Sequence, residues 1–509
     1  MYQETGKTAT KFLLFLNTFL LTIVCVHLFL WARQNYKNKR REQALQAIVQ
    51  KEDIFNASLL LAQEYYPSVD IVQANEVFDS IVDDIRKQIE GVDEPRKIVG
   101  IINKHLYETL HISPIGNALE PSLLLPNKVL EGKKGHCMGL VLLYAAIAER
   151  LQLPIFAKVV PAHIFVYYDD GRSKFNIETT AGGYALPDSH YSHFFPYPDR
   201  IAPGFYLKKL SKAELLGTFL SNLGPLLKEA DRYADALDAY DRALFLAPKS
   251  AEIHTNIGSL YLKLGKAKKA QRFLTKAVEL DPTLWQAHSN LAPLYFNAGD
   301  YERSAEESLK TIDLVDKAIT IRAHPAGLPE GKDPIEMAKE SLRKKDSPFQ
   351  QLVVRGIVCF DKKEYELAER LFERALELNS EDANIYSFLA VTNFHLKNYQ
   401  QAIKYGEIAN GKFGYVPIIG PTFFINKIAE SYIGLGKSYS MLKKYDLSIE
   451  MINKAIEISG PSAKVYTTLA TTHSLKGNKA KAIEFYNKAL ELDPLYELAH
   501  KKLAEITSD

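Results

Sequence analysis

The chain has 509 residues, of which 47% are hydrophobic and 24% are charged. A chain of this length exceeds what one hydrophobic core supports, so we expect two or three domains of ordinary globular composition. The 63 basic and 61 acidic side chains leave a net charge of +2, and this balance argues against nucleic acid as a partner. Three cysteines, Cys25, Cys137 and Cys359, lie in separate regions and predict no disulfide framework.

The N-terminal segment predicts a membrane anchor. After a tail of residues 1–11, residues 12–32 form a run of 21 residues without a charge, which is long enough to cross a bilayer as a helix. A cleaved signal peptide would have a shorter apolar stretch that ends in small residues. The basic residues between Arg33 and Arg41 favour a cytoplasmic location for the soluble part, with export across the membrane as the alternative.

The next region is predicted to be helical and to carry a cysteine at a helix start. Residues 57–66, 74–91 and 95–110 have apolar side chains at three- and four-residue steps. Cys137 then opens an apolar helical pattern over residues 138–151. The helix dipole favours a thiolate at this place, and the amide of the cysteine can bind an oxyanion. A buried structural cysteine is the alternative interpretation.

A predicted β-hairpin follows this helix. Residues 162–168 and 172–179 alternate in polarity around Asp170-Gly171, a dipeptide typical of two-residue type I′ turns. In that register the numbers of facing residues add to 341, so His163 faces Glu178. A carboxylate beside an imidazole fixes the tautomer and supports the imidazolium, as a cysteine nucleophile requires of its base.

This combination resembles the transglutaminase-like superfamily, whose domain is a papain-related α+β fold, and the resemblance covers residues 42–210. It implies that Cys137 is the nucleophile, that His163 is the base, and that Glu178 stands where the family usually has Asp. Asn176 is the second candidate for orienting the imidazole, in the manner of papain. The resemblance extends to a bacterial branch that is often fused to tetratricopeptide repeats and includes members without demonstrated activity.

The second half of the chain repeats itself with a period of 34 residues. The seven registers begin at Gly217, Ala251, Trp285, Phe349, Ala383, Ala429 and Ala463. The eighth and twentieth positions are small in every register, because the two helices of a hairpin touch there. The pattern resembles the tetratricopeptide repeat (TPR) family, which implies an all-α solenoid with a groove for a protein or peptide.

We therefore predict a multidomain protein with a transmembrane helix, an α+β transglutaminase-like domain and an all-α TPR solenoid. The predicted solenoid has repeats 1–3 over 217–318, a linker over 319–348, repeats 4–7 over 349–496 and a capping helix over 497–509. Cys359 occupies a packing position of its repeat.

Two functions agree with these features. The first is a membrane-anchored thiol peptidase or acyl transferase that uses Cys137, His163 and Glu178 and recruits proteins through its repeats. The second is an inactive transglutaminase-like and TPR scaffold at a membrane. No cofactor is expected. His190 and His193 suggest a metal only weakly, because two histidines without a third ligand rarely hold one.

Overall fold

A computed structural model of the protein describes residues 36, 39–115, 120–161, 163–186, 191, 206–322, 348–412 and 421–507. The predicted membrane span over 12–32 lies outside these residues, as do His190, His193 and most of the predicted linker. Among the described helices, none is both long enough and apolar enough to cross a membrane.

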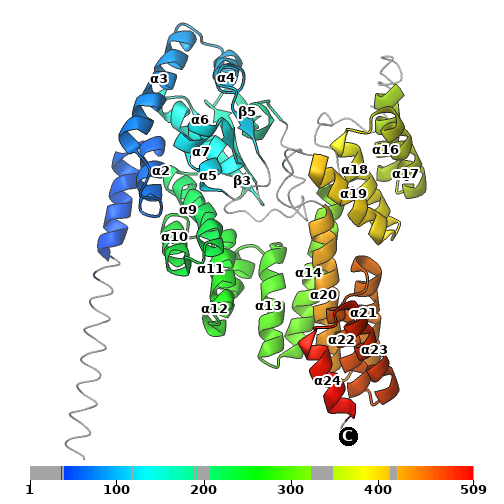
Figure 1. Ribbon diagram of the computed structural model, residues 1–509. Helices are drawn as coiled ribbons and strands as arrows, with labels where there is room; N and C mark the ends of the chain where they lie inside the picture. The colour runs from blue at the N-terminus through cyan, green and yellow to red at the C-terminus, as the bar shows by residue number, and fades with distance from the viewer. Residues whose placement is uncertain are drawn as a thin grey trace, which may run out of the picture.

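The N-terminal unit packs helices around a small antiparallel sheet (Figure 1). Its helices are α2 (Ile54–Gln63), α3 (Ile71–Ile89), α4 (Pro95–Asn103), the π-helical η1 (Lys104–Thr109), α5 (Pro121–Leu124), α6 (Pro126–Gly132), α7 (Cys137–Arg150) and the 3-10 helix η2 (Thr179–Ala181). Its strands are β1 (Ser113–Pro114), β2 (Lys134–Gly135), β3 (Ile155–Val160), β4 (His163–Asp169) and β5 (Lys174–Ile177). The sheet order is β3-β4-β5, and α7 is buried from Cys137 to Ala148 in the middle of the unit.

The β4–β5 hairpin has a longer loop than the predicted two-residue turn. Val166 faces Ile177, so the numbers of facing residues add to 343, and the predicted register is wrong by two residues. The Asp170 carboxylate causes the difference, because it accepts hydrogen bonds from the amides of Arg172 (2.8 Å) and Ser173 (2.6 Å). Since side chains alternate along a strand with a period of two, the shift leaves each one on its predicted face.

The C-terminal half forms an all-helical array of antiparallel pairs. The pairs are α9 (Lys212–Glu229) with α10 (Tyr233–Leu246), α11 (Ala251–Lys263) with α12 (Ala267–Leu280), α13 (Trp285–Asn297) with α14 (Tyr301–Arg322), α16 (Pro348–Asp361) with α17 (Tyr365–Leu378), α18 (Ala383–His395) with α19 (Tyr399–Lys412), α20 (Pro421–Met441) with α21 (Tyr445–Ser459), and α22 (Ala463–Leu475) with α23 (Lys479–Leu492), followed by α24 (Glu497–Thr507). The small eighth position has the expected cause: a β-carbon on Gly224 would lie 2.2 Å from the Tyr240 ring. Helices α9 and α20 begin earlier than the registers at Gly217 and Ala429 predict.

Helices α14 and α20 lie side by side, although two helix pairs separate them in the chain (Figure 1). The buried Ser438 hydroxyl donates a hydrogen bond to the Ser304 hydroxyl at 2.8 Å. Nearer the other ends of the two helices, Leu314 and Ile425 belong to one hydrophobic cluster. The third and sixth pairs are therefore neighbours in space. The fourth and fifth pairs, which separate them in the sequence, do not lie between them. The sequence predicts a block of three repeats followed by a block of four. In the structure the last pair of the first block packs against the third pair of the second block.

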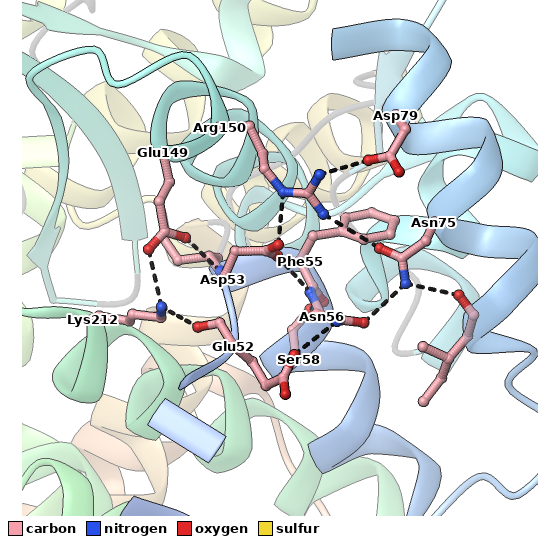
Figure 2. Close-up of polar contacts among 12 residues, drawn as sticks. Glu52, Asp53, Phe55, Asn56, Ser58, Asn75, Asp79, Glu149, Arg150 and Lys212 are labelled. Carbon is pink, nitrogen blue, oxygen red and sulfur yellow. Dashed lines mark hydrogen bonds and ion pairs between the residues drawn. The ribbon is translucent and has the colours of Figure 1, made fainter. Parts of the chain in front are cut away.

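The array and the N-terminal unit share one hydrophobic core, which runs from α2 through α7 to α11. Polar contacts join the same elements (Figure 2). Arg150, at the end of α7, contacts Asp53 at 2.7 Å and Asp79 at 2.6 Å. Lys212, in the first turn of α9, contacts Glu149 at 2.9 Å. The C-terminal end of α7 is thus fixed to α2, α3 and the first array helix.

Candidate active site

Cys137 is the first residue of α7, as the sequence predicts. The residue is 9% exposed, and its sulfur forms no disulfide. Gly139 lets this first turn approach the backbone closely, because a β-carbon there would lie 2.3 Å from the Leu123 carbonyl oxygen. The Leu123 carbonyl also accepts a hydrogen bond from the His136 amide at 2.9 Å. The Cys137 amide belongs to the first helical turn, whose amides have no acceptor within the helix.

The Cys137 thiol and the His163 imidazole interact, and each shifts the pKa of the other. Burial alone would raise the pKa of the thiol, but the charges and hydrogen bonds of His136 and His163 outweigh it and lower the pKa to about 6. Burial would lower the pKa of His163, but the Glu178 charge and the hydrogen bonds to Cys137 and Glu178 raise it to about 10. Both shifts favour a thiolate beside an imidazolium.

Glu178 contacts His163, but not as the facing residue of a hairpin. It follows the end of β5 and N-caps η2, where its carboxylate accepts from the amide of Thr180 at 3.0 Å. Its Oε2 atom nevertheless lies 2.9 Å from His163 Nε2. The prediction that Glu178 faces His163 across the hairpin was wrong, because the loop is longer than the predicted two-residue turn. The predicted contact is present because the long Glu side chain reaches back to β4.

Two further residues complete the environment of the Glu178 carboxylate. Its Oε1 atom also accepts from the Thr180 hydroxyl at 2.5 Å, and its Oε2 atom accepts from the Tyr191 hydroxyl at 3.0 Å. Burial would raise the pKa of Glu178, but the charge of His163 and the hydrogen bonds from His163 and Thr180 lower it to about 2. Neither residue was predicted from the sequence. Thr180 had a local signal, since a capping carboxylate accepts from the residue two positions later. Tyr191 had none.

The other candidates of the sequence analysis have different surroundings. Asn176 faces Tyr167 across the sheet and donates a hydrogen bond to the Leu186 carbonyl at 2.9 Å, so Glu178 is the residue beside the imidazole. Cys359 is buried in the array, as expected for a packing position. Within the described ranges, no three His, Cys, Asp or Glu side chains are grouped to hold a metal ion.

Comparison with known families agrees with both halves of the chain. Residues 73–195 match the model of the transglutaminase-like superfamily. Tetratricopeptide-repeat models match residues 224–265, 251–284, 356–415 and 427–494. The chain joins a transglutaminase-like region to a TPR solenoid. Both predicted resemblances are thereby confirmed at the level of the family, while the catalytic roles of individual residues stay predictions.

Individual relatives cover parts of the chain. A UPF0162 protein of Xylella fastidiosa strain 9a5c is 26% identical over 231 residues, which are 44% of this chain and 82% of that protein. A human cell division cycle protein 16 homolog is 29% identical over 126 residues, or 25% of this chain and 20% of that protein. Among solved structures, a thermophilic TPR protein of Thermus thermophilus is 15% identical, covers 58% of this chain and 100% of its own, and has a TM-score of 0.25.

Proposed function

We propose that the protein is a thiol-dependent peptidase or acyl transferase in which Cys137 attacks, His163 carries protons and Glu178 orients and charges His163. The observation that supports this most is the hydrogen bond between the His163 imidazole and the buried Glu178 carboxylate, beside a Cys137 thiol whose pKa this imidazole lowers. Such an arrangement activates a cysteine nucleophile on unrelated folds.

The geometry supports a two-step reaction. The Cys137 thiolate attacks a carbonyl carbon, and the amide at the start of α7 stabilises the oxyanion. The His163 imidazolium gives its proton to the leaving amine as the carbon–nitrogen bond breaks, which leaves a thioester. Neutral His163 then takes a proton from water or an acceptor amine, which attacks the thioester and releases the thiolate. Water gives hydrolysis, and an amine gives acyl transfer.

The repeats, we propose, hold a protein or peptide near this site. The shared core and the contact between Lys212 and Glu149 hold the first array helix in a constant position relative to α7. A ligand on the array would therefore keep a defined orientation toward Cys137.

Residues 12–32 are proposed to anchor the chain in a membrane, with the soluble part in the cytoplasm by the distribution of basic residues. Full-length protein should then stay in the membrane pellet after carbonate extraction, and a variant that lacks residues 1–40 should not. Protease protection in spheroplasts would reveal which side the soluble part occupies.

The burial of the site favours a second function, an inactive scaffold. Cys137 is 9% exposed, and the side chains of His163 and Glu178 are 8% and 4% exposed. A substrate must reach a sulfur with little open surface. In the scaffold alternative, these residues stabilise the fold and only the repeats bind a partner.

Acylation by p-nitrophenyl acetate separates the two functions. We expect full-length protein to release a burst of one equivalent of nitrophenolate and to carry an acetyl group on Cys137, detected by peptide mass spectrometry. His163→Ala should slow the burst, and Cys137→Ala should abolish it. Cys359 is an internal control, because burial raises the pKa of its thiol. Acetylation of Cys137 no faster than that of Cys359 would favour the scaffold.

A further inference from the structure

His136 lies beside the nucleophile and has no role in the reaction described so far. Its Nδ1 atom is 3.3 Å from the Cys137 sulfur, within the range of a hydrogen bond to sulfur. The residue is only 6% exposed, so this contact is shielded from water. His136 occupies the N-cap position of α7, but its side chain accepts no capping hydrogen bond from the helix amides. The imidazole is instead directed at the sulfur.

We propose that His136 is a second hydrogen-bond donor to the Cys137 sulfur, so that the thiolate is held between two imidazoles. The inference deepens the proposed function and rests on it, because a donor matters only where the sulfur carries a charge. A thiolate accepts hydrogen bonds, so the Nδ1 atom of His136 must carry the proton. Both a neutral imidazole with its proton on Nδ1 and an imidazolium supply this N–H.

The charged groups around His136 agree with that role. Burial and the charge of His163 both lower its pKa, whereas the charge of Cys137 and the hydrogen bond to it raise the pKa, and the net direction is upward. The two upward effects exist only while the sulfur is an anion. His136 therefore responds to the state of Cys137, while His163 is held charged by Glu178 in addition.

The second donor has a chemical consequence in each half of the reaction. A thiolate with two donors persists to lower pH but is a weaker nucleophile, because nucleophilicity falls with pKa. In the second half the thioester carbon–sulfur bond breaks, its electron pair returns to the sulfur, and the proton of the acceptor passes to His163. The His136 N–H stabilises the charge that reappears on the sulfur, and a thiol of lower pKa leaves faster. His136 should thus favour transfer of the acyl group.

The test measures alkylation of Cys137 by iodoacetamide across pH in full-length protein, followed by mass spectrometry. His136→Phe keeps a ring but removes the donor. We expect the apparent pKa of Cys137 to rise by about one unit, which by thiolate fraction alone makes alkylation near pH 6 roughly fivefold slower. His136→Gln, which keeps an N–H, should lie between this variant and the wild type. Hydrolysis of acetyl-enzyme should also slow in His136→Phe.

His105→Phe is the matched control, because His105 is another buried histidine of the same domain and contacts Gln88 rather than the nucleophile. Its alkylation profile should equal that of the wild type. If His136→Phe and His136→Gln also follow the wild type while His163→Ala raises the pKa of Cys137, the second-donor role is wrong and the proposed function stands. If wild-type Cys137 already titrates as a free thiol, the proposed function itself fails.

Discussion

The Nε2 atom of His163 lies 2.9 Å from the Oε2 atom of Glu178, although Glu178 lies beyond the strand that pairs with β4. The contact joins a residue at the start of β4 to the cap of η2, and it depends on the carboxylate rather than on the hairpin register. Four hydrogen bonds from His163, Thr180 and Tyr191 hold that carboxylate in place.

Glu178→Gln should deactivate the thiol while keeping the shape of the site. Without the negative charge, the His163 imidazolium loses its main support, so the ion pair with Cys137 weakens and the pKa of Cys137 rises from about 6 toward the ~8.5 of a free thiol. Alkylation of Cys137 near pH 6 should fall by about tenfold or more. An unchanged rate would mean that Glu178 does not support the imidazolium.

Acid should remove the stabilisation that Glu178 provides. Burial opposes ionisation, but the charge of His163 and the hydrogen bonds lower the pKa of Glu178 to about 2. A lowered pKa contributes stability that is complete above the unfolded value of about 4.3 and is lost as the pH falls toward 2, on the order of 3 kcal/mol in all. The difference in urea midpoint between wild type and Glu178→Gln should therefore shrink between about pH 5 and pH 2. A constant difference would contradict the lowered pKa.

Tyr191→Phe should destabilise the site by removing one donor to a buried carboxylate. The Tyr191 ring stacks on Phe165 with 3.6 Å between centroids, and this packing remains in the variant. The lost hydrogen bond to a charged group should cost about 1.5–3 kcal/mol of unfolding free energy, measured by urea denaturation. Tyr184→Phe is the control, because Tyr184 is 74% exposed, and it should change stability little. Equal effects of the two changes would argue against the contact with Glu178.

Arg150→Met should loosen the attachment of α7. Arg150 is partly buried and contacts both Asp53 and Asp79, so its loss leaves two carboxylates without their cation. We expect a loss of about 1–2 kcal/mol of unfolding free energy, whereas Lys87→Met, which breaks an exposed pair within α3, should cost less than about 0.5 kcal/mol. Thermal denaturation of the two variants compares them. A similar small effect of both would mean that the network of Figure 2 adds little.

Ser304→Cys combined with Ser438→Cys tests the pairing of α14 with α20. The two hydroxyl oxygens are 2.8 Å apart, so cysteines at both positions should form a disulfide under mild oxidation. The product should migrate differently on a non-reducing gel, and either single variant should not. Failure of the double variant to oxidise would contradict the proximity of the third and sixth helix pairs.

Prediction from the sequence succeeded where one local pattern decides the structure. The apolar run after Cys137 predicted α7, and the period of 34 predicted the first helix of several pairs, such as α11 at Ala251 and α22 at Ala463. It failed where a distant contact or one side chain decides. The Asp170 carboxylate lengthens the hairpin loop, and the pairing of Ser304 with Ser438 leaves no periodic signal.

The contribution of Tyr191 illustrates the same limit within the site. Tyr191 reaches Glu178 from a segment thirteen residues away, and nothing in its neighbours distinguishes it from other tyrosines. The strand alternation did bring His163 and Glu178 to one face, because a shift of two residues preserves the face. The contact between them was therefore predicted from a register that was itself wrong.

The charge on Cys137 is tested most directly by ultraviolet titration of the thiolate in full-length protein, taken as the difference between wild type and Cys137→Ser. Cys25 and Cys359 contribute equally to both proteins and cancel. We predict a thiolate transition at a pH of about 6 in the wild type. In His163→Ala the transition should move to higher pH. A wild-type transition at or above the ~8.5 of a free thiol would contradict an activated nucleophile.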